Sequence, residues 1–171
     1  MKKGIEWQLF PKNLSCPSHL HKIVDAFVKH LDSIDSTSNQ LDSNTVLGCL
    51  TNDFASLGYE VEMSKKDEDK IKVPVLYGKN GKLEKSFDAD AYSQELKTVI
   101  EVEAGRAVTN YQFLKDLFEA CVMTDVEYCV IAVRRIYRTF DDFNKVITFM
   151  DTLYSSTKFS LPLKGVLIIG Y

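Results

Sequence analysis

The chain has 171 residues, of which 45% are hydrophobic and 26% are charged, a composition typical of one soluble globular domain with a substantial core. The formal net charge of −3 and the pI of about 5.6 argue against a protein that coats nucleic acid with a basic surface, although they leave room for a nuclease with a carboxylate site. No apolar run approaches the roughly 20 residues that span a bilayer, and the N-terminus lacks the apolar segment of a signal peptide, so we expect a cytoplasmic protein without membrane association.

The N-terminal third has the periodicity of two helices. Apolar residues recur at helical spacing in residues 16–34 and again in residues 41–59, where Gly58 marks the end. The histidines of the first segment point to different helix faces and do not indicate a metal site. The four cysteines have no paired CxxC spacing, which favours reduced thiols over disulfides or a zinc site.

After Gly58 the pattern changes to that of strands. Residues 59–63 alternate, residues 64–70 form a charged loop, and residues 71–92 give two strands joined at Asn80-Gly81, a strong hairpin signal. Pro74 places its strand at an edge or a bulge.

The C-terminal half alternates strands and helices. Strands are expected at residues 98–104, 127–136 and 163–171, with helices at 109–123 and 140–156 between them. The predicted inward side chains of the first of these helices are Tyr111, Leu114, Leu117, Phe118 and Cys121. The fold class is therefore α/β, with a mixed sheet flanked by helices.

Two pairs of acidic residues stand out in this sheet. Glu101 and Glu103 share one face of their strand, because side chains alternate across a strand. Asp88 and Asp90 share a face of the preceding strand, and a short turn separates the two strands, so the acids can converge. Converging carboxylates repel one another unless a cation lies among them, and oxygen ligands of this kind suit Mg²⁺ or Mn²⁺.

The alternative is that these acids line the solvated face of an antiparallel sheet, where polar residues commonly alternate with apolar ones. Two observations favour a site. The strand of Glu103 leads through Gly-Arg into an amphipathic helix, and the next strand ends in Arg134, Arg135 and Arg138, cations that suit a phosphate backbone.

An aspartate in a hairpin strand, followed about ten residues later by an apolar-flanked Glu-x-Glu and a helix ("IEVEAGRAVTNYQFLKDLFEA"), resembles the PD-(D/E)XK nuclease superfamily. The glutamate at position 103, where that signature usually ends in lysine, is similar to the variant of BamHI- and BglII-type enzymes. The resemblance implies a restriction-endonuclease-like αβββαβαβ core over residues 41–171, with residues 1–40 as an N-terminal helical extension of a single domain, 1–171. The stretch 59–103 would be a meander whose acids face away from the crossover helix.

The resemblance also assigns roles to residues. Asp90 and Glu101 would be metal ligands, and Asp88 competes with Asp90 for its role. Glu103 would accept a proton from the attacking water or help to hold a second ion. A polar residue on the preceding helix would complete the site, for which Asn44 is preferred over Asp42 and Asp53. The residues that could contact nucleic acid are Arg106, Gln112, Lys115, Arg134 and Arg135.

Two functions follow from these observations. The first is a Mg²⁺- or Mn²⁺-dependent DNA endonuclease of restriction type that acts as a homodimer, since cutting both strands is readily done with two sites. The second is an inactive module of the same fold that binds nucleic acid or protein. The set of acids favours the nuclease, whereas the low pI, the small size and the missing lysine favour the module.

Overall fold

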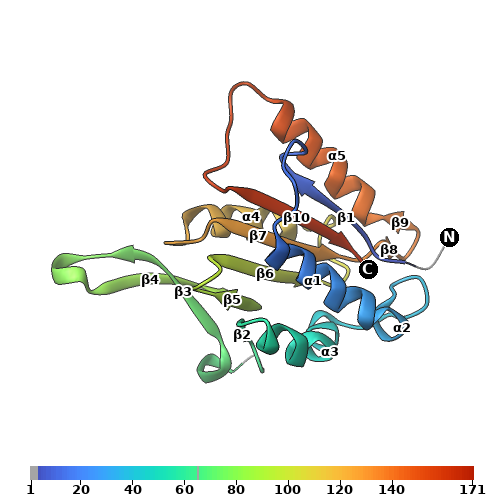
Figure 1. Ribbon diagram of the computed structural model, residues 1–171, viewed down its shortest axis with the longest axis horizontal. Helices are drawn as coiled ribbons and strands as arrows, with labels where there is room; N and C mark the ends of the chain where they lie inside the picture. The colour runs from blue at the N-terminus through green and yellow to red at the C-terminus, as the bar shows by residue number, and fades with distance from the viewer. Residues whose placement is uncertain (1–3, 65) are drawn as a thin grey trace.

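The structure, a computed structural model, describes residues 4–64 and 66–171 (Figure 1). Within these residues, no helix is long and apolar enough to cross a membrane. The helices are α1 (Ser18–Lys29), α2 (Leu31–Ile34), α3 (Ser43–Ser56), α4 (Gln112–Val122) and α5 (Asp142–Ser155), with short 3₁₀ turns η1 (Asp67–Asp69) and η2 (Lys79–Gly81). The strands are β1 (Glu6–Phe10), β2 (Glu60–Val61), β3 (Ile71–Tyr77), β4 (Leu83–Ala89), β5 (Ala91–Ser93), β6 (Thr98–Glu103), β7 (Tyr128–Val133), β8 (Ile136–Tyr137), β9 (Phe140–Asp141) and β10 (Gly165–Gly170).

A mixed six-stranded sheet forms the centre, in the order β1-β10-β7-β6-β5-β2. Strands β6, β7 and β10 run parallel to one another. Strand β1 pairs antiparallel with β10 at one edge of the sheet; on the other side β5 pairs antiparallel with β6, and β2 with β5. Parallel central strands are covered on both faces and are therefore apolar throughout; every residue of β10 is buried. The mixed α/β class is confirmed.

Helices cover both faces of this sheet, as Figure 1 shows. One face of the sheet packs against α1, α2 and α3, with Phe27 and Phe54 among the fully buried side chains. The other face packs against α4 and α5, which contribute Phe113 and Met150. Alternate residues of β6 point to the two layers, Ile100 to the first and Val99 to the second. This alternation decides which helix layer each acid of β6 meets.

The N-terminal segment is not only helical. Residues 6–10 form β1, which pairs with β10 along its whole length from Glu6↔Gly170 to Phe10↔Val166. Helix α1 lies in the same core as α3. The prediction that residues 1–40 form a helical extension is therefore wrong for residues 6–10. Residues 1–3 lie outside the described part of the chain.

The stretch 59–103 differs from a simple meander. Strand β2 pairs with β5, and β5 with β6, while β3 and β4 form a separate two-stranded hairpin between them. The turn at Asn80-Gly81 is confirmed, and both residues have positive φ (58° and 71°). A register shift directly after Pro74 confirms the expected irregularity. Figure 1 shows the hairpin projecting away from the rest of the molecule.

Candidate active site

An acidic cavity of about 200 Å³ opens beside β6, α4 and the junction of β4 with β5. Seven of its thirteen lining residues are acids, an unusual concentration for a protein recess. These acids are Glu62, Asp88, Asp90, Glu101, Glu103, Asp116 and Glu119. The other lining residues are Ser43, Lys70, Ala89, Val102, Gln112 and Lys115. The cavity thus brings together all four acids singled out from the sequence.

Strand β6 supplies Glu101 and Glu103 on one face, as expected from alternation. That face was predicted to point away from the crossover helix, and the structure shows the opposite. Both acids lie beside Asp116 of α4, on the side of Val99, so they face the crossover helix instead of pointing away from it. Glu101 and Glu103 are half-buried. The Tyr171 hydroxyl, which donates to the backbone oxygen of Glu103 at 3.0 Å, fixes the end of the strand.

Asp90 lies at the bend between β4 and β5, where two neighbouring strands hold it. The backbone N–H of Val102 donates to Asp90 Oδ2 at 2.8 Å, and the N–H of Glu62 donates to the Asp90 carbonyl oxygen at 2.8 Å. Asp88 is more exposed and accepts a hydrogen bond from Lys70 Nζ at 2.5 Å. The backbone fixes Asp90 more firmly than Asp88, which supports Asp90 as the principal ligand candidate.

Helix α4 contributes an acid that the sequence analysis missed. The buried side of α4 consists of Phe113, Asp116, Leu117 and Ala120, whereas Tyr111 and Phe118, predicted to point inward, are each 64% exposed. Asp116 is 4% exposed, and its Oδ2 has no hydrogen-bond partner in the described part of the chain. The signal was present in the sequence as an aspartate at helical spacing within an apolar stripe.

Enclosure in the cavity raises the pKa of three carboxyl groups. Burial, together with Asp90 and Asp116, raises the pKa of Glu101 well above its ordinary value. Burial and the neighbouring Asp116 raise the pKa of Glu103 to about 8. Burial also raises the pKa of Asp116 to about 6, although Lys115 opposes this shift. Burial disfavours a charge that has no partner, and clustered like charges add to that cost.

Two lysines line the cavity, and each is paired with an acid at its rim. Lys115 Nζ lies 3.0 Å from Glu119 Oε2, and Lys70 is paired with Asp88. Neither lysine forms an ion pair with Glu101, Glu103 or Asp116 within the described part of the chain. Gln112 donates to Asp116 Oδ1 at 3.2 Å. Lys115 and Gln112, two of the residues predicted to contact nucleic acid, thus line the cavity.

The donor set fits a hard divalent cation. Carboxylate oxygens are the ligands that Mg²⁺ and Mn²⁺ prefer, and the carboxyl group of Asp116 has that of Glu103 as its neighbour. Among residues 4–64 and 66–171, no three acidic, histidine or cysteine side chains stand close enough to hold an ion as they are. Asp90, Glu101 and Glu103 would have to move closer together to hold one.

The arginines of the sequence analysis have different surroundings. Arg134 donates to the Leu41 carbonyl oxygen and is only 8% exposed. Arg135 is 5% exposed and forms a 2.6 Å ion pair with Glu6. Both guanidinium groups are buried and bind residues from distant parts of the chain, so in this structure neither is presented to a phosphate. Arg106 is exposed in the turn after β6, where a ligand can reach it.

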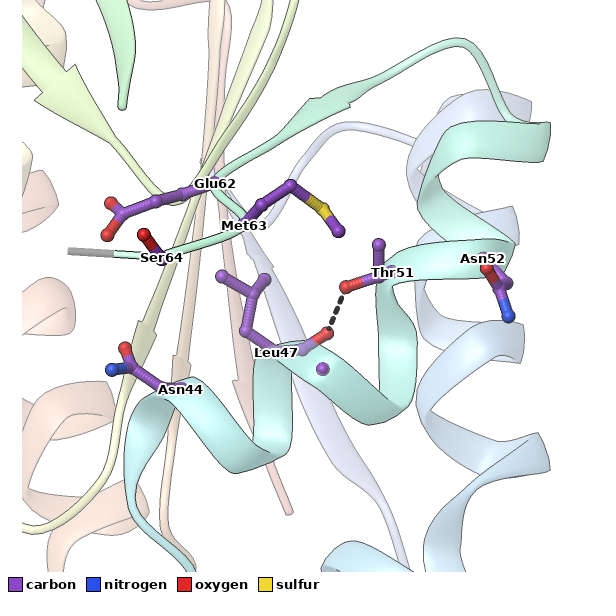
Figure 2. Close-up of a pocket in the computed structure, with 8 residues that line it drawn as sticks. Asn44, Leu47, Thr51, Asn52, Glu62, Met63 and Ser64 are labelled. Carbon is purple, nitrogen blue, oxygen red and sulfur yellow. Dashed lines mark hydrogen bonds between the residues drawn. The ribbon is translucent and has the colours of Figure 1, made fainter. Parts of the chain in front are cut away.

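The polar candidates on α3 also lie elsewhere. Asn44 lines a second cavity of about 600 Å³ between α3 and the segment after β2, shown in Figure 2. Asp42 caps α3 by accepting from the Thr45 N–H at 2.8 Å. Asp53 binds Lys29 and His30. Glu62 lines both cavities, so it lies nearer to the acids of β6 than the candidates on α3 do.

No protein-family model matches the chain, and no curated protein matches it in sequence. Among solved structures, the crystal structure of free BglII is similar to it, with a TM-score of 0.51 and 11% sequence identity over 98% of this chain and 78% of BglII. At this identity the likeness concerns the fold. The central mixed sheet with helices on both faces is a restriction-endonuclease-like fold.

Proposed function

We propose that this protein is a Mg²⁺- or Mn²⁺-dependent endonuclease that hydrolyses DNA phosphodiester bonds in the manner of a type II restriction enzyme. The observation that carries the proposal is the convergence of Asp90, Glu101 and Glu103 on one cavity of a BglII-like fold. These are the residues that the sequence resemblance assigns to the chemistry. We infer that two copies act together on the two strands of a duplex.

Each residue of the site has a role in this proposal. Asp90 and Glu101 would hold the cation, and the cation would supply charge neutralisation at the scissile phosphate and a lowered pKa of water. Glu103 would accept the proton of the attacking water or help to hold a second ion. In the metal-free cavity the raised pKa of Glu103 keeps this carboxyl protonated near neutral pH; a bound cation would displace that proton and leave a carboxylate able to accept one from water. Arg106, which is exposed in the turn after β6, and Lys115, once released from Glu119, would neutralise the flanking phosphates.

The test is nicking of supercoiled plasmid and of single-stranded DNA with Mg²⁺ or Mn²⁺ at low salt. Glu103→Gln keeps the size of the side chain but cannot accept the proton, so we expect cleavage to slow by about 10²–10⁴-fold. The matched control is Glu95→Gln, at an exposed position outside the cavity, which should cleave at the wild-type rate. Equal rates for wild type and Glu103→Gln would remove Glu103 from the chemistry.

An inactive binding module is the second candidate. The position that holds lysine in most of the superfamily is Glu103 here, and the cavity lysines are occupied by Glu119 and Asp88. If wild-type protein cuts neither substrate and Mn²⁺ produces no binding heat in calorimetry, the nuclease proposal fails and the module replaces it.

A further inference from the structure

The β3–β4 hairpin ends in a projecting segment, residues 76–85, here called the arm tip. The hairpin is anchored at its base, where Val73 and Ala89 are buried. The Thr124 N–H donates to the Pro74 carbonyl oxygen at 2.8 Å. Beyond this anchor the two strands pair with each other in a sheet of their own. In Figure 1 the arm tip is the part of the hairpin farthest from the six-stranded sheet.

The arm tip exposes apolar groups that a folded core would normally cover. Leu76, Tyr77 and Leu83 are 54%, 49% and 45% exposed. Tyr77 is the register partner of Leu83, so these two exposed side chains lie side by side on the hairpin, and Leu76 directly precedes Tyr77.

The arm tip is also positively charged on an acidic protein. It carries Lys79, Lys82 and Lys85 against one acid, Glu84, a formal charge of +2 in a chain whose total is −3. Lys79 and Lys82 form no ion pair with any described residue, and Lys85 lies 5.1 Å from the ring centre of Phe87. Internal pairing therefore does not explain these lysines.

The same hairpin leads directly to the acidic cavity. Strand β4 runs from Leu83 in the arm tip to Asp88 and Ala89, which line the cavity, and Asp90 follows. At about 3.3 Å per residue, the arm tip extends roughly 15–25 Å from these acids. This distance is comparable to the width of a DNA duplex, whose major groove admits a two-stranded β-ribbon.

We propose that the arm tip is a second contact surface for duplex DNA, which it grips while the acidic cavity lies against the backbone. Lys79, Lys82 and Lys85 contact phosphates on either side of the groove, and Tyr77 and Leu76 contact the base edges. This inference rests on the proposed function for its choice of partner, although binding through the arm tip does not require cleavage.

The test is fluorescence anisotropy with a labelled 24-base-pair duplex in EDTA, which prevents cleavage, at 50–200 mM NaCl. Each phosphate contact contributes about −0.9 to the slope of log K against log salt. The triple variant K79A/K82A/K85A should therefore flatten this slope by about 2–3 and weaken binding at least tenfold at 50 mM. The charge-matched control K22A/K145A/K158A, which changes lysines outside the arm, should bind as wild type does.

Three outcomes would overturn the inference: no duplex binding by the wild type, wild-type affinity and slope in the arm variant, or an equal loss in the control. The three lysines are exposed, so the arm variant should keep the wild-type thermal unfolding midpoint. A further variant, L76S/L83S, separates DNA from a second copy of the chain as the partner. If it lowers the molar mass in light scattering and leaves duplex affinity unchanged, the arm tip is an interface between copies. If the wild-type protein binds duplex DNA through the arm tip but does not cleave it, only the nuclease proposal is refuted.

Discussion

Glu103→Gln should stabilise the metal-free protein at pH 8 and leave its stability unchanged at pH 4.5. In the folded chain the pKa of Glu103 is raised to about 8 from an ordinary value of 4.5. Below pH 4.5 the group is protonated in both states. As the pH rises toward 8, the unfolded chain releases the proton while the folded chain retains it, so unfolding becomes progressively easier. Stability is thus fully present at low pH and is lost as the pH rises through the folded pKa.

The size of the effect follows from the shift. One pKa unit corresponds to about 1.4 kcal/mol, so the full shift sets an upper bound of about 5 kcal/mol. Partial exposure of Glu103 and its coupling to Glu101 and Asp116 reduce this bound, and we expect a gain on the order of 3 kcal/mol. For a chain of this length that corresponds to a rise of about 6–12 °C in the unfolding midpoint at pH 8.

The assay is thermal unfolding by circular dichroism in EDTA, from pH 4.5 to pH 8.5. Glu95→Gln serves as the control, because its side chain is exposed and outside the cavity; its midpoint should follow that of the wild type at every pH. A wild-type midpoint that does not fall between pH 5 and 8, or a Glu103→Gln variant without a gain at pH 8, would refute the account of the cavity as a cluster of uncompensated acids.

Two further predictions concern the metal and the core. Asp90→Ala or Glu101→Ala should abolish Mn²⁺ binding in isothermal titration calorimetry, and unchanged affinity in both variants would place the site elsewhere. Phe27→Ala should lower the free energy of unfolding in urea by about 3–5 kcal/mol, because the Phe27 ring is fully buried between Phe54 and Tyr171; a loss below about 1 kcal/mol would show that this layer is not tightly packed.

The local sequence pattern correctly predicted three elements of the fold. The alternation around Glu101 predicted β6, the apolar stripe predicted α3, and Asn80-Gly81 predicted the hairpin turn. It was insufficient where pairing is long-range. Strand β1 is stabilised by β10, more than 150 residues away in sequence, and nothing within its five residues determines that partner. Pairing of β2 with β5, which leaves the hairpin outside the sheet, is likewise decided by tertiary contacts.

The rotation of α4 was wrong for a different reason. Two sets of residues fit helical spacing, one through Leu114 and Phe118 and one through Phe113 and Asp116, and the aspartate made the second set look solvent-exposed. The same rule failed at Arg134 and Arg135, which are buried because backbone and carboxylate partners satisfy them. In each case a charged residue lies inside the protein, where charged side chains are rare.

The buried arginines and the buried acids differ in whether partners explain their burial. Arg134 and Arg135 have partners that explain their burial, whereas Glu101, Glu103 and Asp116 form no ion pair with any described lysine, arginine or histidine. A purely structural network of buried acids would be expected to include such cations, because uncompensated burial costs stability at neutral pH. Local rules are broken without structural compensation mainly where function requires it. That β6 and α4 break them at the same cavity supports a role for these acids toward an external cation.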